Sequence, residues 1–224
     1  MAILSGNALK LFAAFCMVCD HVGLMFFPGQ AWLRTIGRLA FPIFAYMIAE
    51  GCKYTRNRKR YFGMIFALAT ACQIVYYLFD GSMYLSILFT FSLSILGIYA
   101  LDGCKRTPGV PAGFVLGFAI GLIWAANQVF TIDYGFWGCM VPIFASLPTG
   151  TKYDRLSLRA LALGVGLLPL AIEFGGNQTL SLLAVPLLLL YSGKRGKWNM
   201  KYFFYIFYPA HLVILQGIQM LLWY

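Results

Sequence analysis

The chain consists mainly of apolar runs that are long enough to cross a lipid bilayer as helices. Such runs recur along all 224 residues, of which 61% are hydrophobic and only 11% are charged. About 20 apolar residues in a helix span the hydrocarbon core of a membrane, and soluble domains carry about twice this share of charge. The sequence therefore predicts an all-α polytopic integral membrane protein, a helical bundle forming a single transmembrane domain over residues 1–224.

Nine transmembrane helices are predicted, and the sixth and eighth are the shortest. Their expected bounds are 6–27, 32–50, 61–79, 83–101, 112–130, 134–149, 157–174, 178–192 and 202–223. Neither a basic segment nor a small-residue cleavage site accompanies the first apolar run, so we expect this span to remain in the mature protein.

Basic residues alternate with the predicted spans and thereby indicate an orientation. Cytoplasmic loops retain Lys and Arg, and the intervening turns of this chain hold Asp80, Asp133 and Glu173 instead. The basic loop residues are Lys53, Arg56, Arg58, Lys59, Arg60, Lys105, Arg106, Lys152, Arg155, Lys194, Arg195, Lys197 and Lys201. We expect a multi-pass protein of the cell (plasma or inner) membrane with a cytoplasmic N-terminus and an extracytoplasmic Tyr224. The net charge of +10 then reflects topology, and no nucleic-acid partner is expected.

Cys16 and Cys19 form a C-x-x-C motif directly before Asp20 and His21, which raises the question of a metal or haem site. Haem attachment by this motif requires His immediately after the second Cys, where this chain has Asp20. Thiols at cytoplasmic loops also stay reduced. We interpret the six cysteines as small structural side chains and expect no metal.

The first predicted span contains Lys10 and His21, although a charged side chain in lipid is costly unless it faces protein or water. Eleven residues at about 100° each make three turns plus about 20°, so the two side chains share one helix face, about 16.5 Å apart along the axis. This stripe suits a long molecule with an anionic inner end. The alternative is that Lys10 snorkels to the interface and His21 is a buried structural residue.

Asp20 points about 100° away from His21 and therefore needs a partner on another helix. Arg34 and Arg38 lie one turn apart in the second predicted span, at a similar depth, so we expect Asp20 to pair with one of them. Glu50, at the cytoplasmic end of that span, is expected to meet the basic loop that follows. Purely structural ion pairs are the alternative interpretation.

His211 follows Tyr208 and Pro209 in the last predicted span. Pro209 removes one helix hydrogen bond, and interrupted helices occur in membranes where they line a cavity. Further polar side chains inside spans are Gln73, Asn127 and Gln128. Together these residues predict a hydrated cavity lined by several helices, in which groups such as Gln73 and Tyr208 position a substrate.

Three segments, "LKLFAAFCMVCDHVG", "LRTIGRLAFPIFAYMIAEGCKYTRNRKRY" and "KYFFYIFYPAHLVIL", closely resemble the TraX family, named for the protein that acetylates the N-terminus of conjugative F pilin. The family is similar in turn to acyl-CoA-dependent membrane acyltransferases, whose first span carries a basic residue, ten further residues and a histidine. Lys10 and His21 fit this spacing. The resemblance implies that His21 is catalytic and that Lys10 binds acyl-CoA, with Arg56, Arg58 and Arg60 as candidates for the CoA phosphates.

The resemblance implies acetyl transfer from cytoplasmic acetyl-CoA to an amine or hydroxyl of an extracytoplasmic acceptor, either a pilin-like peptide N-terminus or a glycan. His21 would act as the base or accept the acetyl group itself, with Asp20 and His211 completing the catalytic set and Arg34 and Arg38 positioning it. Two other classes stay open. Intramembrane Asp, His and Arg also suit a proton-coupled small-solute transporter, and a non-catalytic membrane assembly protein would share the fold.

Overall fold

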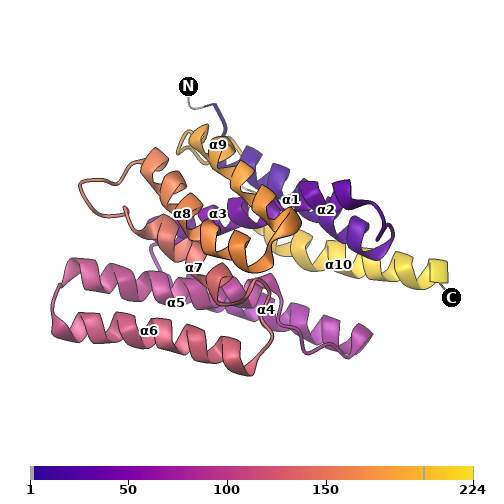
Figure 1. The fold of residues 1–224 in the computed structure, drawn as a ribbon, viewed down its shortest axis with the longest axis horizontal. Helices are drawn as coiled ribbons and strands as arrows, with labels where there is room; N and C mark the ends of the chain where they lie inside the picture. Colours follow the sequence, from indigo (N-terminus) through magenta and orange to yellow (C-terminus); the bar gives the residue numbers. More distant parts are fainter. Residues whose placement is uncertain (1–2, 199, 224) are drawn as a thin grey trace. The chain divides into compact units, whose positions relative to one another are not determined.

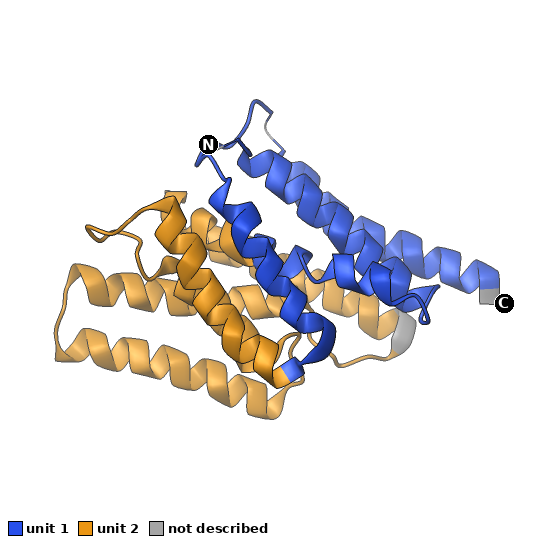
Figure 2. Ribbon diagram, turned by 45° about the horizontal axis from the view of Figure 1, so that its top comes forward, with its two compact units in different colours: residues 1–44, 174–224 blue, residues 45–173 orange. Residues whose placement is uncertain are grey.

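The computed structural model describes residues 3–198 and 200–223, and the chain forms two compact units (Figure 2). Unit 1 combines the two ends of the sequence, Met1–Phe44 and Phe174–Tyr224, and unit 2 is the middle, Ala45–Glu173. Each unit is helical, and the β structure of the described residues is limited to isolated bridges. The two units are described separately below.

Unit 1 is built around α1, which packs against α2 and α10, while the 3₁₀ helix η1 contacts α2 and α9. Ser5 caps α1, because its hydroxyl accepts the Ala8 N–H at 3.2 Å. A bridge between Leu4 and Tyr191 fastens the start of α1 to the end of α9. The elements are α1 (Gly6–Met25), α2 (Ala31–Gly37), the start of α3 (Ala40–Tyr54), η1 (Gly176–Leu183), α9 (Ala184–Leu189) and α10 (Lys201–Trp223).

Unit 2 is organised around α5, which packs against α4, α6 and α7 (Figure 1). The Ser94 hydroxyl of α5 donates to a carbonyl of its own helix, Thr90 O, and lies 2.8 Å from Cys139 O of α7, so buried polar groups support this packing. The elements are the rest of α3, α4 (Arg58–Asp80), α5 (Ile87–Arg106), α6 (Val110–Val129), α7 (Gly135–Ser146) and α8 (Leu156–Phe174).

Among the described residues, six helices are long and apolar enough to cross a membrane: α1, α4, α5, α6, α8 and α10. This confirms an all-α, multi-pass membrane protein but not nine spans. The predicted spans 134–149 and 178–192 correspond to shorter apolar segments, Gly135–Ser146 and Gly176–Leu189. The second of these begins as a 3₁₀ helix and becomes α-helical only at Ala184.

The predicted span 32–50 is wrong as a single helix, because the chain divides there into α2 and α3. At the junction, the Arg38 Nε–H donates to the Arg34 carbonyl at 3.3 Å. Since α3 restarts at Ala40, Pro42 falls in its first turn, where the missing N–H costs no helix hydrogen bond. Arg38 consequently lies at a helix junction and not in the middle of a span.

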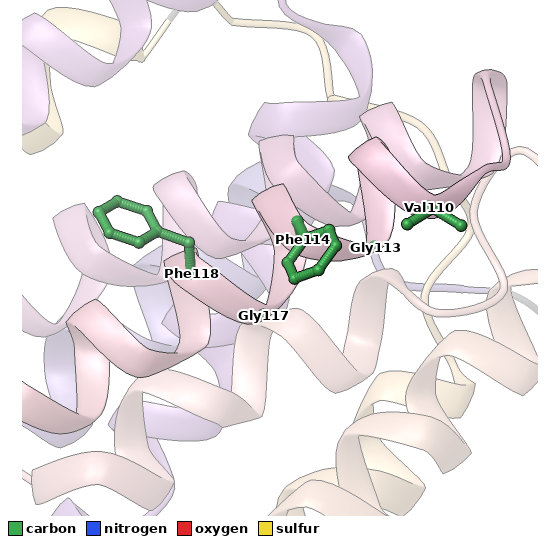
Figure 3. Close-up of a pocket in the computed structure, with 5 residues that line it drawn as sticks. All are labelled: Val110, Gly113, Phe114, Gly117 and Phe118. Carbon is green, nitrogen blue, oxygen red and sulfur yellow. The ribbon is translucent and has the colours of Figure 1, made fainter.

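The exposed side of α6 has a shallow groove (Figure 3). A Cβ built at Gly113 or Gly117 would meet no atom within 4 Å, so these glycines leave open space between the phenylalanines. The lining residues are Val110, Gly113, Phe114, Gly117 and Phe118, none of which is ionisable. The groove is therefore suited to apolar contacts and offers no groups for chemistry.

Candidate active site in unit 1

Two histidines from opposite ends of the sequence meet in unit 1. The ring centroids of His21 on α1 and His211 on α10 are 5.1 Å apart, with an edge-to-face angle of 77°. Phe207 stacks on the His211 ring at 5.3 Å, and Tyr208 packs edge-on against it at 5.5 Å. The structure thus brings together His21, His211 and Tyr208, three residues that the sequence had placed in one site.

Each imidazole is held in the same tautomer by its own helix. His21 Nδ1 lies 2.8 Å from the Met17 carbonyl, and His211 Nδ1 lies 3.0 Å from the Phe207 carbonyl. A carbonyl oxygen only accepts, so Nδ1 carries the proton in both rings, and Nε2 of the neutral ring bears a lone pair. His211 Nε2 is buried without a hydrogen-bond partner among the described residues. The pair can therefore receive a proton or a hydrogen bond from a bound molecule.

The predicted stripe on the first helix is supported, because α1 is continuous from Gly6 to Met25. The Lys10 ammonium lies 5.8 Å from the centre of the Phe204 ring on α10. Lys10 and His21 thus both face α10, with a cation at one end of the stripe and the imidazoles at the other. The interruption expected at Pro209 is absent, since α10 runs as one helix from Lys201 to Trp223.

Asp20 lies between two guanidinium groups. Its Oδ1 is 2.7 Å from Arg38 Nη2, and its Oδ2 is 3.3 Å from Arg34 Nη1. The expected ion pair is confirmed, and the structure adds the second arginine. Gly37 makes this approach possible, because a Cβ at that position would overlap the Asp20 carboxylate. The three charged side chains together carry one net positive charge.

Gln178 extends this ionic group and was not singled out from the sequence. Its Oε1 accepts a hydrogen bond from Arg38 Nη1 at 3.1 Å. The residue lies on η1, inside the segment predicted as the apolar span 178–192. Polar residues in the run "GNQTLSLL" were the available signal, because polar side chains within a membrane segment are costly and often functional.

Glu50 has a different partner from the one expected. It forms an ion pair with Arg159 of α8 in unit 2, so the prediction that it meets the basic loop is wrong. Arg159 is fully buried, its Nε–H donates to the Ala145 carbonyl at 3.4 Å, and its guanidinium lies 5.4 Å from the Tyr46 ring centre. A buried guanidinium requires a carboxylate, which explains the pairing. The sequence does contain a signal for this pairing, because Arg159 lies inside the predicted span 157–174 and a charge there needs a partner.

The basic loop of unit 2 contains one paired and two exposed arginines. Arg58 forms an ion pair with Asp102 and lies 5.0 Å from the centre of the Tyr99 ring. Arg56 and Arg60 are exposed. Of the three candidates for the CoA phosphates, Arg56 and Arg60 are therefore the ones placed to meet a ligand from solution.

The polar residues Gln73, Asn127 and Gln128 have local surroundings in unit 2. Gln73 Nε2 donates to the Ser82 carbonyl at 2.9 Å, and Asn127 Nδ2 donates to the Ile123 carbonyl of its own helix at 2.8 Å. Gln128 is exposed. The hydrogen bonds described for these residues do not join them in one cavity.

The C-x-x-C motif contributes to packing. Cys16 is fully buried in an apolar cluster with Met17 and Ala40, and Cys19 is partly exposed. All six cysteines are free thiols. Within residues 3–198 and 200–223, no group of three or more His, Cys, Asp or Glu side chains is arranged to hold a metal ion.

Comparison with known proteins places these features in a family. The family model described as "TraX protein" matches residues 5–219. The chain is 28% identical over 248 residues to the "Probable fimbrial assembly protein FimC, serogroup H1" of Dichelobacter nodosus, covering 97% of each chain. It is 26% identical over 222 residues to "Protein TraX" of Escherichia coli, covering 93% of this chain and 85% of that protein. No solved structure shows a significant match. Because the family model spans both histidines and the Asp20 cluster, the chain belongs to the TraX family.

Proposed function

We propose that the chain is a membrane-embedded acetyltransferase that moves an acetyl group from acetyl-CoA to an amine or hydroxyl of an extracytoplasmic acceptor. The observation that carries this proposal is the pair of imidazoles, 5.1 Å apart, whose Nδ1 atoms are held by helix carbonyls. A neutral imidazole whose Nδ1 carries the proton can accept a proton at Nε2, which suits general base catalysis. The family resemblance of Lys10 and His21 supports the same chemistry.

In the proposed step, the acceptor nitrogen or oxygen attacks the thioester carbonyl carbon while His21 Nε2 takes its proton. The carbon–sulfur bond then breaks, the acetyl group stays on the acceptor, and the CoA thiolate leaves and collects a proton. His211 hydrogen-bonds the acceptor beside His21. The same geometry also permits His21 to carry the acetyl group before passing it on.

The direction of transfer follows from the basic loops, which we assign to the cytoplasm. Acetyl-CoA enters from that side, and the cationic partners proposed for its phosphates are Lys10 and the exposed Arg56 and Arg60. Tyr224, which marks the extracytoplasmic end in this assignment, lies outside the described residues. The name of the Dichelobacter nodosus relative, a probable fimbrial assembly protein, favours a fimbrial or pilin-like subunit peptide as acceptor, with a glycan as the other class. The rival transporter hypothesis loses one support, because α10 is not interrupted.

CoA capture gives the test of this proposal. Replacing Arg56 and Arg60 with Gln should weaken CoA binding by about 1–3 kcal/mol, the usual range for charge-assisted contacts. Calorimetric titration of purified protein with CoA measures the effect. In contrast, Arg58→Gln should mainly lower the melting temperature, because Arg58 already faces Asp102.

The second basic loop supplies a control with an equal change of charge. Its carbonyls at Lys194 and Arg195 accept the Gly6 and Asn7 N–H groups at 2.8 and 2.9 Å, so this loop folds over the start of α1. Replacing Lys194 and Lys197 with Gln should leave CoA affinity unchanged. Loss of affinity in this variant alone would transfer the phosphate-binding role to the second loop. If neither double variant loses affinity for CoA, then neither loop binds the CoA phosphates, and the proposed acetyl donor has no binding site.

A further inference from the structure

Two buried polar side chains on η1, one of which is hydrogen-bonded to Arg38, have no role in the chemistry proposed above. Gln178 is 5% exposed and Ser181 is 0% exposed, both on η1. Neither Gln178 Nε2 nor Ser181 Oγ has a hydrogen-bond partner in the part of the chain that the structure describes. Buried polar atoms are nearly always hydrogen-bonded, so two open groups on one short helix require an explanation.

The direction of the Gln178 amide follows from its partner. A guanidinium can only donate, so the amide oxygen faces Arg38 and the NH₂ group points away with two open donors. A 3₁₀ helix has three residues per turn, so Gln178 and Ser181 project from the same side of η1. The structure therefore places the Gln178 amide donor and the Ser181 hydroxyl on the same side of η1. The Arg38 guanidinium contacts the opposite end of the Gln178 amide.

The charge of this region has the complementary sign. Asp20 is shared by Arg34 and Arg38, which leaves one positive charge in excess. Asp20 is also the only acidic residue in the sequence of unit 1, so this unit has no second acidic side chain to neutralise the excess. Hydrogen-bond donors backed by positive charge recognise anionic oxygen atoms.

We propose that Gln178 and Ser181, backed by Arg38, bind a fixed anionic group, a carboxylate or a phosphate, on the acceptor. The identity of the ligand as acceptor rests on the proposed function. Asp20 projects about 100° away from His21 around α1, so the cluster that it organises lies to the side of the imidazoles. This placement suits an anchor for a part of the acceptor away from the acetylated atom. Gln178 and Ser181 are accordingly positioning residues.

The test compares anion-dependent melting of the purified full-length protein and three variants. The probes are inorganic phosphate and acetate, with acetamide as the neutral counterpart and sodium chloride holding the ionic strength constant. Gln178→Glu keeps an oxygen facing Arg38 but replaces the open donor with a negative oxygen. Ser181→Ala removes the hydroxyl. Gln30→Glu makes the same change of charge at an exposed position and serves as the control.

At least one anion should raise the melting temperature of the wild type above the value in acetamide, because a ligand that binds only the folded state stabilises it. Gln178→Glu and Ser181→Ala should lose most of this rise, whereas Gln30→Glu should keep it. The anion that acts identifies the group as carboxylate or phosphate. Without any probe, Ser181→Ala should melt at or above the wild-type temperature, because it removes an open buried hydroxyl.

Three results would overturn the proposal. The first is that neither anion raises the melting temperature of the wild type, and the second is that an anion raises it equally in Gln178→Glu and Gln30→Glu. The third is a clear fall in the melting temperature of Ser181→Ala without probe. The last result would mean that the hydroxyl serves the fold. None of these measurements depends on acetyl-CoA or on turnover. Failure of the acetyltransferase proposal would therefore not change the melting results, and a negative melting result would not contradict acetyl transfer.

Discussion

The two units hold their buried charges in different ways. In unit 2, Glu50 and Arg159 form an ion pair of balanced charge whose side chains are almost entirely removed from solvent. In unit 1, Asp20 is divided between Arg34 and Arg38, and the next residue on α1, His21, meets His211 of α10. The pair in unit 2 leaves no net charge, although Arg159 Nη2 is buried without a hydrogen-bond partner among the described residues, whereas the cluster in unit 1 leaves one positive charge in excess. This difference in net charge is the reason why we expect a structural role for the first and propose a binding role for the second.

Other polar groups of unit 2 also serve its helices. The Lys105 ammonium donates to the carbonyls of Ser146 and Thr149, at 2.7 and 3.1 Å, at the C-terminal end of α7. Cations are favourable at that end of a helix because of the helix dipole. The Thr90 hydroxyl donates to the Asp133 carbonyl at 2.6 Å. These contacts join helices to loops and provide no chemistry.

The largest effect is expected from breaking the balanced pair. Glu50→Gln leaves the Arg159 charge buried without a carboxylate, which should lower the free energy of unfolding by about 3–5 kcal/mol. Thermal unfolding of purified protein measures the loss. Arg106→Gln, at a side chain that is 68% exposed, is the control and should have little effect. A double variant with Leu at positions 50 and 159 should recover much of the stability. Wild-type melting of Glu50→Gln would contradict the structural role of the pair.

A smaller effect is expected at the unbalanced cluster. Asp20→Asn should lower the free energy of unfolding by about 1–3 kcal/mol, because it removes two charge-assisted hydrogen bonds. The loss should be smaller than for Glu50→Gln, since Arg34 is 31% exposed and water can solvate its charge. The same unfolding experiment ranks the two variants. If Asp20→Asn is the more damaging, the contrast between the units fails.

The smallest effect concerns the loop ion pair of unit 2. Burial alone would raise the pKa of Asp154, but the Gly150 N–H and the Lys53 ammonium outweigh it, so the pKa lies below its ordinary value. A lowered carboxyl pKa stabilises the fold above the ordinary pKa, and this contribution is lost as the pH falls through the lowered value. Asp154→Asn should therefore cost less than about 1 kcal/mol at pH 7. Unfolding measured from pH 7 downward should show the difference from wild type beginning to shrink near pH 4, about the ordinary pKa, and disappearing once the pH is below the lowered pKa. A constant difference would exclude the carboxylate as its source.

Much of unit 1 could be predicted from the sequence because the relevant signals are local. The length of α1 follows from its apolar run, and the shared face of Lys10 and His21 follows from helix geometry. The pairing of Asp20 with an arginine follows from the cost of an isolated charge in a membrane. Each of these inferences depends either on the geometry of a single helix or on a membrane charge that must have a partner of opposite sign.

The rest depended on contacts between distant segments. The span 32–50 divides between Gly37, which lies against Asp20, and Pro42 in the first turn of α3, and hydropathy reports neither feature. Hydropathy places Gln178 at the start of an apolar span, and its contact with Arg38 follows only from the position of η1. Arg159 was visible as a cation in a predicted helix, but its pairing with Glu50 requires the packing of α8 against α3.

The central claim, that His21 is the base for acetyl transfer, is tested most directly by His21→Gln. Gln fills similar space and can still hydrogen-bond, so the variant should melt near the wild-type temperature and bind CoA normally. Acetyl transfer should fall by roughly 10² or more, the usual contribution of a general base, and wild-type transfer should rise with pH as the imidazole loses its proton. Turnover and melting are to be measured on the same preparation, so that a folding defect is not mistaken for a catalytic one. A stable, fully active His21→Gln protein would contradict the account.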